Sequence, residues 1–115
     1  MGTRAPANQP PSVGRMVEDV VGCKWSLAVL GAIRRGVRRP GSIRRSIDGL
    51  TAKVLNERLR KLAAYGILER RAYPEIPPRV EYRLTAFGRK FAGILRSIER
   101  LERQASRRPP RSAAG

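Results

Sequence analysis

Within residues 51–84, the spacing of the apolar residues changes from the period of a helix to the two-residue period of β-strands. The first part of this stretch carries leucines at positions i, i+4 and i+7: Leu55, Leu59 and Leu62. On a helix these three side chains form one apolar stripe. Thr51 is suited to cap the helix, because its hydroxyl can accept a hydrogen bond from a backbone N–H of the first turn. Gly66 stands where a left-handed residue commonly ends a helix, so the pattern predicts a helix over residues 51–65.

The second part of the stretch predicts a β-hairpin. Residues 68–73 and 79–84 each alternate with a period of two, as half-buried strands do. Three prolines lie between them and cannot donate to a strand ladder, so they belong to the connection: Pro74, Pro77 and Pro78. A helix followed by a basic hairpin suggests a recognition helix at about 51–65 and a wing at about 68–84.

The charge balance narrows the classes of partner. The 115 residues include 25 Lys and Arg against 9 Asp and Glu, which gives a formal net charge of +16. Self-repulsion at this level favours a polyanionic partner, either nucleic acid or an anionic membrane. No apolar run approaches the roughly 20 residues of a transmembrane helix, and residues 1–14 lack the apolar segment of a secretory signal. A single cysteine excludes an intrachain disulfide, so we expect a one-domain cytoplasmic protein.

The chain contains no histidine, which removes the commonest general base and the commonest metal ligand. With one thiol and scattered carboxylates, no recognisable motif supplies a nucleophile–base pair or a metal cluster. We therefore expect no enzymatic activity, no metal and no cofactor.

The first expected helix follows a Pro-rich, polar tail at residues 1–11, which we expect to be disordered. Ser12 can cap it, and its apolar positions follow helical spacing: Val13, Met16, Val17, Val20 and Val21. A stripe this wide must pack on something. The pattern leaves two alternatives open, the core of the domain and an interface between subunits.

The next segments predict the first half of a helix-turn-helix. Gly22 ends the first helix, and residues 24–33 are apolar on nearly every side, as in a helix at the centre of a domain. Residues 37–39 fit a short edge strand, and residues 41–46 fit a short helix that leads through a turn to the helix at 51–65. A short helix, a tight turn and a second helix make a helix-turn-helix.

A last helix is expected after Thr85. Its apolar stripe is continuous: Phe87, Phe91, Ile94, Leu95, Ile98 and Leu101. This stripe extends past any obvious partner in so small a domain, which favours dimerisation. The domain is expected to span residues 12–103, followed by a disordered basic tail at 104–115. The expected interface combines residues of the first and last helices: Val13, Met16, Val17, Val20, Phe91, Ile94, Leu95, Ile98 and Leu101.

Four segments carry a resemblance to a known family: Gly22–Leu27, Lys53–Leu59, Tyr73–Tyr82 and Leu84–Gly88. The ten residues YPEIPPRVEY at 73–82 are the most specific. Over about residues 13–101 the chain resembles the HxlR-type winged helix-turn-helix regulators of bacteria. The resemblance implies a mainly α fold with a small β-hairpin, a homodimer built by the first and last helices, and binding of double-stranded DNA.

Two positions depart from the pattern of that family. Pro40-Gly41 stands where an aromatic residue followed by serine is usual, and Cys23 stands where glycine is common. Some relatives sense quinones, aldehydes or oxidants through a cysteine nearer the N-terminus, so sensing does not transfer to Cys23 by position. Beside Lys24 at a helix N-terminus, the thiol pKa would be lowered, which makes Cys23 a candidate sensor of a small electrophile or oxidant. The alternative is a small buried hydrophobe.

The candidate DNA contacts form three groups. The polar side of the helix at 51–65 offers groups that read bases or hold phosphate: Thr51, Ala52, Lys53, Asn56 and Arg60. The wing offers arginines suited to phosphates or a narrow minor groove: Arg70, Arg71 and Arg79. Four more frame the short helix as backbone clamps: Arg38, Arg39, Arg44 and Arg45. An ordinary solvated surface is the alternative for each group.

The sequence as a whole predicts a sequence-specific transcriptional regulator, located at the nucleoid, that reads an inverted-repeat operator as a dimer. The alternative from another class is a non-specific or architectural nucleic-acid-binding protein. A membrane-surface protein is disfavoured, because the apolar stripes lie in helices that also fit one compact fold.

Overall fold

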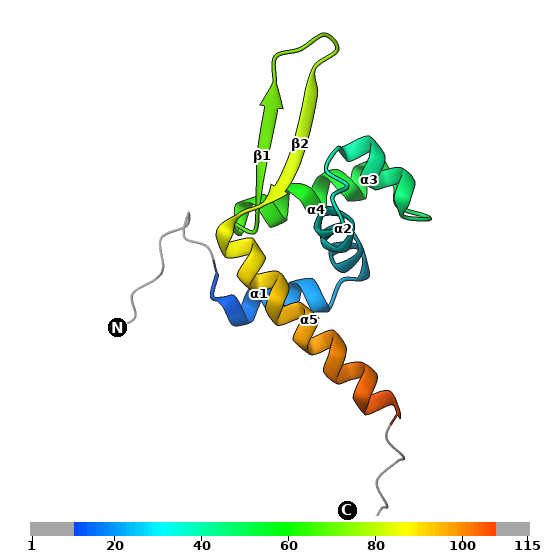
Figure 1. Ribbon diagram of the computed structural model, residues 1–115, viewed down its shortest axis with the longest axis vertical. Coiled ribbons are helices and arrows are strands. Elements are labelled where there is room, and N and C mark those ends of the chain that lie inside the picture. Colours follow the sequence, from blue (N-terminus) through cyan, green and yellow to red (C-terminus); the bar gives the residue numbers. More distant parts are fainter. Residues whose placement is uncertain (1–10, 108–115) are drawn as a thin grey trace, which may run out of the picture.

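The computed structural model describes residues 11–107, which form helices and one antiparallel hairpin (Figure 1). The elements in chain order are α1 (Val13–Val21), α2 (Lys24–Arg34), α3 (Pro40–Ser46), α4 (Ala52–Ala64), β1 (Leu68–Tyr73), β2 (Arg79–Leu84) and α5 (Ala86–Arg107). The hairpin rises from one side of the helical body, and α5 runs away from its other side. The winged helix-turn-helix order expected from the sequence is therefore confirmed.

The core gathers around α2, as its apolar character predicted. Val29 and Leu30 are fully buried, and α1, α3, α4 and β2 all contact this helix. The leucine stripe of α4 is also buried: Leu55, Leu59 and Leu62. Burying the stripe fixes which side of α4 faces solvent, because side chains three and four residues apart share one face of a helix.

Local signals set the ends of several elements. The Ser12 hydroxyl accepts from the Arg15 backbone N–H at 3.1 Å and caps α1. The Thr51 hydroxyl accepts from the Val54 backbone N–H at 3.2 Å and caps α4. Gly66 has a φ of 80° immediately after α4, where a residue with a Cβ would be strained.

Two expected elements are corrected. Residues 37–39 form no strand; instead, the Tyr82 backbone N–H donates to the Arg38 carbonyl oxygen at 2.9 Å, and α3 starts directly afterwards. Pro40 is the first residue of α3, one position earlier than expected, because proline already has the φ of a first helical residue.

The ends of the domain also differ from expectation. Helix α5 continues to Arg107, so residues 104–107 are helical rather than part of a disordered tail. They carry no Pro or Gly, and the first proline of that segment is Pro109. The rest of both expected tails, residues 1–10 and 108–115, lies outside the described residues.

The start of α5 is held against the turn between α4 and β1. The Thr85 backbone N–H donates to the Ile67 carbonyl at 3.1 Å, and the Thr85 hydroxyl donates to the Gly66 carbonyl at 2.5 Å. A Cβ on Gly88 would lie 2.0 Å from the Ile67 carbonyl oxygen. Glycine is therefore required at position 88 for this close approach.

The residues expected at a dimer interface divide into two sets. Four are buried inside the single chain and belong to its own core: Met16, Val20, Phe91 and Leu95. Three are substantially exposed, with 43% of Val13, 44% of Ile94 and 65% of Leu101 accessible. Val17 and Ile98 are half-buried. The core alternative for the first stripe therefore holds for Met16 and Val20, whereas the interface alternative stays a prediction for the exposed residues.

Candidate nucleic-acid interface

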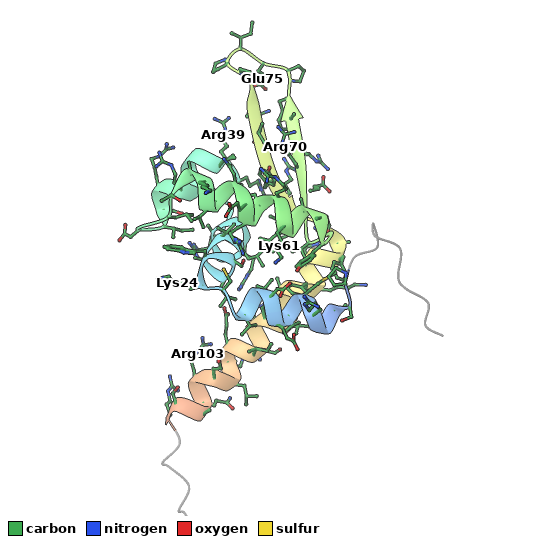
Figure 2. The ribbon with its side chains drawn as sticks, turned by 180° about the vertical axis from the view of Figure 1, so that it is seen from behind. Lys24, Arg39, Lys61, Arg70, Glu75 and Arg103 are labelled. Atoms are coloured by element: carbon green, nitrogen blue, oxygen red, sulfur yellow. The ribbon has the colours of Figure 1, made fainter. Side chains whose placement is uncertain are left out.

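The outer side of α4 carries the expected base-reading residues. Burial of its leucine stripe leaves five neighbouring positions exposed: Thr51, Ala52, Lys53, Asn56 and Arg60. Figure 2 shows this side of the molecule, with α4 facing the viewer and Arg39, Lys61 and Arg70 around it. Amide and cationic groups on such a face can read base edges or hold phosphate.

The arginines around α3 are free for a partner. All four are exposed: Arg38, Arg39, Arg44 and Arg45. Arg45 donates to the Ser42 hydroxyl at 3.3 Å, but none of the four pairs with a carboxylate within residues 11–107. Since α3 contacts α4, these cations lie near the exposed face of α4.

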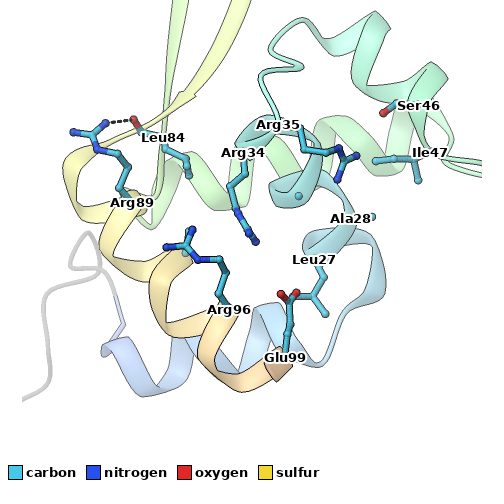
Figure 3. Close-up of a pocket in the computed structure, with 12 residues that line it drawn as sticks. Leu27, Ala28, Arg34, Arg35, Ser46, Ile47, Leu84, Arg89, Arg96 and Glu99 are labelled. Carbon is cyan, nitrogen blue, oxygen red and sulfur yellow. Dashed lines mark hydrogen bonds between the residues drawn. The ribbon is translucent and has the colours of Figure 1, made fainter. Parts of the chain in front are cut away.

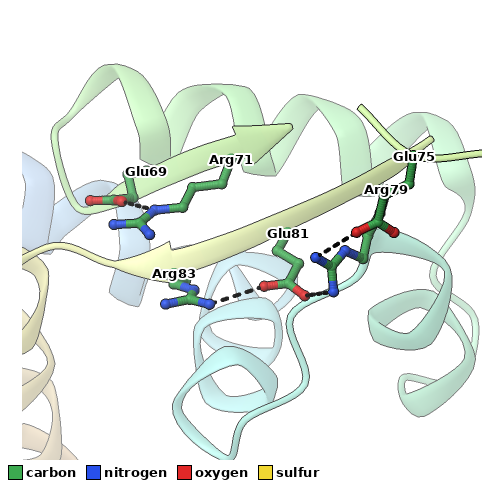
Figure 4. Close-up of polar contacts among 6 residues, drawn as sticks. All are labelled: Glu69, Arg71, Glu75, Arg79, Glu81 and Arg83. Atoms are coloured by element: carbon green, nitrogen blue, oxygen red, sulfur yellow. Dashed lines mark hydrogen bonds and ion pairs between the residues drawn. The ribbon is translucent and has the colours of Figure 1, made fainter. Parts of the chain in front are cut away.

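The two faces of the hairpin differ in charge. The strands pair in antiparallel register, with Arg70 opposite Tyr82 and Arg71 opposite Glu81. The face of Arg71 carries a ladder of ion pairs (Figure 4). Arg71 lies 2.5 Å from Glu69, and Glu81 lies 3.4 Å from Arg79 and 3.3 Å from Arg83. This face therefore balances much of its charge internally.

Arg79 was expected to be a free wing contact, but it is held inside the hairpin. It pairs with Glu75 at 3.0 Å and with Glu81 at 3.4 Å, and its guanidinium lies 3.9 Å from the centre of the Tyr73 ring. Only 28% of its side chain is exposed. Charge count along the sequence could not reveal this set of partners, since Tyr73 lies opposite Arg79 on the other strand.

Arg70 is the expected wing arginine with the fewest partners. It is exposed and forms no ion pair in the part of the chain that the structure describes. Arg71 differs, because its hydrogen bond and ion pair with Glu69 hold its pKa above the usual value. At the end of the hairpin, Ile76 is fully exposed. Among residues 11–107, Arg70 is thus the one wing arginine without an ion pair, and the tip of the wing is apolar.

Cys23 forms a contact with α4 that the sequence did not predict. It occupies the N-cap position of α2 and is half-buried. Arg58 of α4 donates to its sulfur at 3.7 Å, whereas the expected neighbour Lys24 lies over the Trp25 ring at 4.7 Å. Arg58 sits between leucines of the core stripe, and no sequence pattern linked it to residue 23.

The pKa of the Cys23 thiol lies below its usual value. Burial raises the pKa, but the Ser26 hydroxyl and the backbone N–H groups of Ser26 and Trp25 outweigh this effect, with a further contribution from the Arg58 charge. A lowered pKa enriches the thiolate, which is the reactive form of cysteine. The position therefore meets one chemical requirement of a reactive thiol.

Neither a metal-binding cluster nor a membrane-spanning helix is found within residues 11–107. Those residues contain no group of three or more Cys, Asp or Glu side chains that could hold a metal ion. None of the helices described has both the length and the apolar character needed to cross a bilayer.

Comparison with known families gives one match over most of the chain. Residues 20–109 match the family model of the HxlR-like helix-turn-helix. An uncharacterized HTH-type transcriptional regulator of Synechocystis sp. is 45% identical over 85 residues, which is 74% of this chain and 63% of that protein. YtcD of Bacillus subtilis is 38% identical over 67% of this chain and 61% of its own length. The chain thus spans less than two thirds of these two relatives.

Two solved structures share the fold. The redox regulator HypR in its reduced form superposes with a TM-score of 0.71 at 32% identity, covering 84% of this chain and 95% of HypR. Diamide-treated YodB from B. subtilis superposes with a TM-score of 0.69 at 26% identity, covering 78% of this chain and 89% of YodB.

Proposed function

The chain belongs to the HxlR-like helix-turn-helix family, and from that premise we propose that it is a sequence-specific, DNA-binding transcriptional regulator. The observation that carries the proposal is the exposed polar face of α4, which lies beside the free arginines of α3 and the hairpin. The names of the relatives support it, since they are HTH-type transcriptional regulators. We assign it no enzymatic activity and place it in the cytoplasm, at the nucleoid.

We infer that α4 enters the major groove by its N-terminal half, as recognition helices usually do. Thr51, Ala52, Lys53 and Asn56 then approach base edges, and Arg60 approaches the backbone. Arg70 follows the flanking groove at the wing, and Arg71 and Arg79, on the other face of the hairpin, stabilise it through ion pairs. The α3 arginines hold the adjacent phosphates.

The same chain acts, in this proposal, as a two-fold homodimer. Exposed apolar side chains on α1 and α5 support it: Val13, Phe87, Ile94 and Leu101. A two-fold dimer reads an inverted repeat whose half-site centres lie about one helical turn apart, roughly 34–36 Å, or a multiple of that distance.

Selection from random-sequence duplexes tests this function against the architectural alternative. The immobilised protein is mixed with a duplex library at physiological salt, and the retained fragments are sequenced over successive rounds. We expect enrichment of one inverted repeat. Retention without any enriched sequence would instead identify a non-specific or architectural DNA-binding protein.

A second proposal concerns regulation through Cys23. The contact between Arg58 and the Cys23 sulfur joins a thiol of lowered pKa to the recognition helix. We propose that modification of the thiol by a small electrophile or oxidant displaces Arg58 and lowers DNA affinity. The name of HypR, a redox regulator that shares the fold, supports this reading.

The test measures affinity for the selected duplex before and after treatment with benzoquinone, with mass spectrometry to count adducts. Cys23→Ser is the matched control, because it keeps the size of the side chain and removes the reactive sulfur. We expect weaker binding after modification of the wild type only. Unchanged affinity at complete modification would leave Cys23 with a structural role.

A further inference from the structure

A cleft of about 960 Å³ lies between α2 and α5, closed at one end by the segment that leaves α3 (Figure 3). No residue of α4 lines it, so DNA bound on the outer side of α4 would not occupy it. Its volume falls within the range of roughly 300–1,000 Å³ that is typical of small-molecule sites. The cleft therefore has the size of a site for a ligand other than DNA.

The walls of the cleft combine apolar surface with an excess of cations. Leu27, Ala28 and Ala92 contribute apolar surface from its two main helices. Four arginines also line it, against a single carboxylate from Glu99: Arg34, Arg35, Arg89 and Arg96. Figure 3 shows Arg34 and Arg96 pointing into the space between α2 and α5.

These arginines lack anionic partners within residues 11–107. None of them forms an ion pair with a carboxylate, Glu99 included. Arg89 donates to the Leu84 carbonyl at 3.4 Å, which holds it at one end of the cleft, whereas Glu99 lies beside Leu27 at the other (Figure 3). The charge along the cleft is thus uneven, and its Arg34–Arg89–Arg96 end favours an anion.

The cleft is separate from the apolar stripe proposed for dimerisation. The residues of α5 in the cleft are Arg89, Ala92, Arg96 and Glu99, and the exposed stripe contains Phe87, Ile94 and Leu101. At 3.6 residues per turn, the two rows lie roughly 180° apart around the helix. A partner subunit that covers the stripe therefore leaves this row of α5 uncovered.

We propose that the cleft binds a small organic anion with an apolar body, such as an aromatic or medium-chain carboxylate. Guanidinium groups suit a carboxylate because they offer paired N–H donors in one plane. The apolar wall from α2 and α5 covers the body of the ligand. Ser46 and Ile47 also line the cleft, so the bound anion lies between α5 and the turn that leads to α4.

Calorimetric titration of the full chain with 2-naphthoate and with octanoate tests the proposal. The variant Arg34→Gln/Arg96→Gln removes two cations from the cleft. Arg100→Gln is the matched control, since Arg100 is exposed on the same helix but does not line the cleft. Circular dichroism verifies the fold of each variant, and light scattering gives its mass.

We expect one site per chain for at least one carboxylate. Binding should weaken about tenfold or more in the double variant and stay within about twofold in Arg100→Gln, because only the former loses charge-assisted hydrogen bonds. Uncharged 2-naphthamide should bind about tenfold more weakly than 2-naphthoate for the same reason. The proposal requires these carboxylates to bind more tightly than inorganic phosphate, which lacks an apolar body.

Three results would overturn the proposal. The first is the absence of saturable binding by both carboxylates, and the second is equal binding of inorganic phosphate, which would reveal only general attraction to a basic protein. The third is a monomer mass for the double variant while Arg100→Gln keeps the mass of a dimer. That result would identify the cleft as an interface between two copies of the chain. All three readouts are independent of DNA binding.

Discussion

Asp19 and Tyr65 join α1 to the C-terminal end of α4. The Tyr65 hydroxyl donates to Asp19 Oδ2, and Lys61 lies 3.6 Å from the same carboxylate. This hydrogen bond is the largest cause of the lowered pKa of Asp19. Burial and the hydrogen bond to Asp19 raise the pKa of Tyr65 to about 12.

The first prediction follows from the sign of the Tyr65 shift. The folded protein holds the phenol proton more tightly than the unfolded chain, so this contribution to stability is complete below pH 10.0 and is lost as pH rises towards about 12. We therefore expect the free energy of unfolding, measured with denaturant between pH 8 and 12, to be higher for the wild type than for Tyr65→Phe at the lower end of this range. This difference should shrink as the pH rises towards about 12. A difference that stays constant with pH, or the same change in the control Tyr82→Phe, would contradict the assignment.

The second prediction separates free from paired wing arginines. Arg70→Ala should weaken binding to the selected and scrambled duplexes by similar factors. The slope of log affinity against log salt concentration should become shallower by about one for each phosphate that the side chain had neutralised. Arg79→Ala should change the slope less, because Glu75 and Glu81 already neutralise this guanidinium. The measurement is affinity over a salt series, and a larger change of slope for Arg79→Ala would reverse the assignment.

At the residue scale, the sequence predicted which side chains are exposed better than what they contact. The spacing of Leu55 and Leu59 correctly placed Asn56 on the outer face of α4, because helical periodicity is local. The stacking of Arg79 on Tyr73 and the contact of Arg58 with Cys23 depend on how strands and helices meet. Such tertiary contacts leave no period in the sequence.

Among the elements, the junction between the hairpin and α5 gives a third prediction. Gly88→Ala should destabilise the fold by about 1–3 kcal/mol, the usual cost of overpacking, because its Cβ would lie 2.0 Å from a backbone oxygen. Gly93→Ala in the same helix meets nothing closer than 3.9 Å and should stabilise by about 0.5–1 kcal/mol. Urea unfolding measures both, and equal effects would contradict the close approach.

The elements themselves followed from the sequence wherever periodicity and caps agreed. The α1 and α4 caps and the two paired strands were predicted and are confirmed. The strand at 37–39 was wrong, since a single backbone bond to Tyr82 does not make a ladder. The end of α5 was placed too early, because a polar segment without Pro or Gly can extend a helix as readily as it can stay unfolded.

For the whole molecule, the fourth prediction is a two-fold dimer. Ile94→Asp places a charge on a residue that is 44% exposed in the single chain, so the fold should survive while burial of that charge opposes association. Light scattering at micromolar concentration should give a dimer for the wild type, a monomer for Ile94→Asp and a dimer for the control Arg100→Asp. A monomeric wild type would exclude the dimer.

The overall architecture was predictable from the sequence, whereas the division of the apolar stripes was not. Met16 and Phe91 turned out to be core residues, but 65% of Leu101 is exposed. The stripe pattern is the same in both cases, because any apolar surface removed from water is stabilising whether the covering atoms belong to one chain or two. Only the packing of α1 and α5 separates the two sets.

The most direct test of the account compares wild type and Asn56→Ala on the selected duplex and a scrambled duplex. If α4 reads bases, Asn56→Ala should lose about 1–3 kcal/mol of binding free energy on the selected duplex. It should also discriminate less between bases at one base pair per half-site. Its affinity for the scrambled duplex should hardly change, because phosphate contacts remain. Equal weakening on both duplexes, with the preference for the selected sequence intact, would contradict the assignment of α4 as the recognition helix.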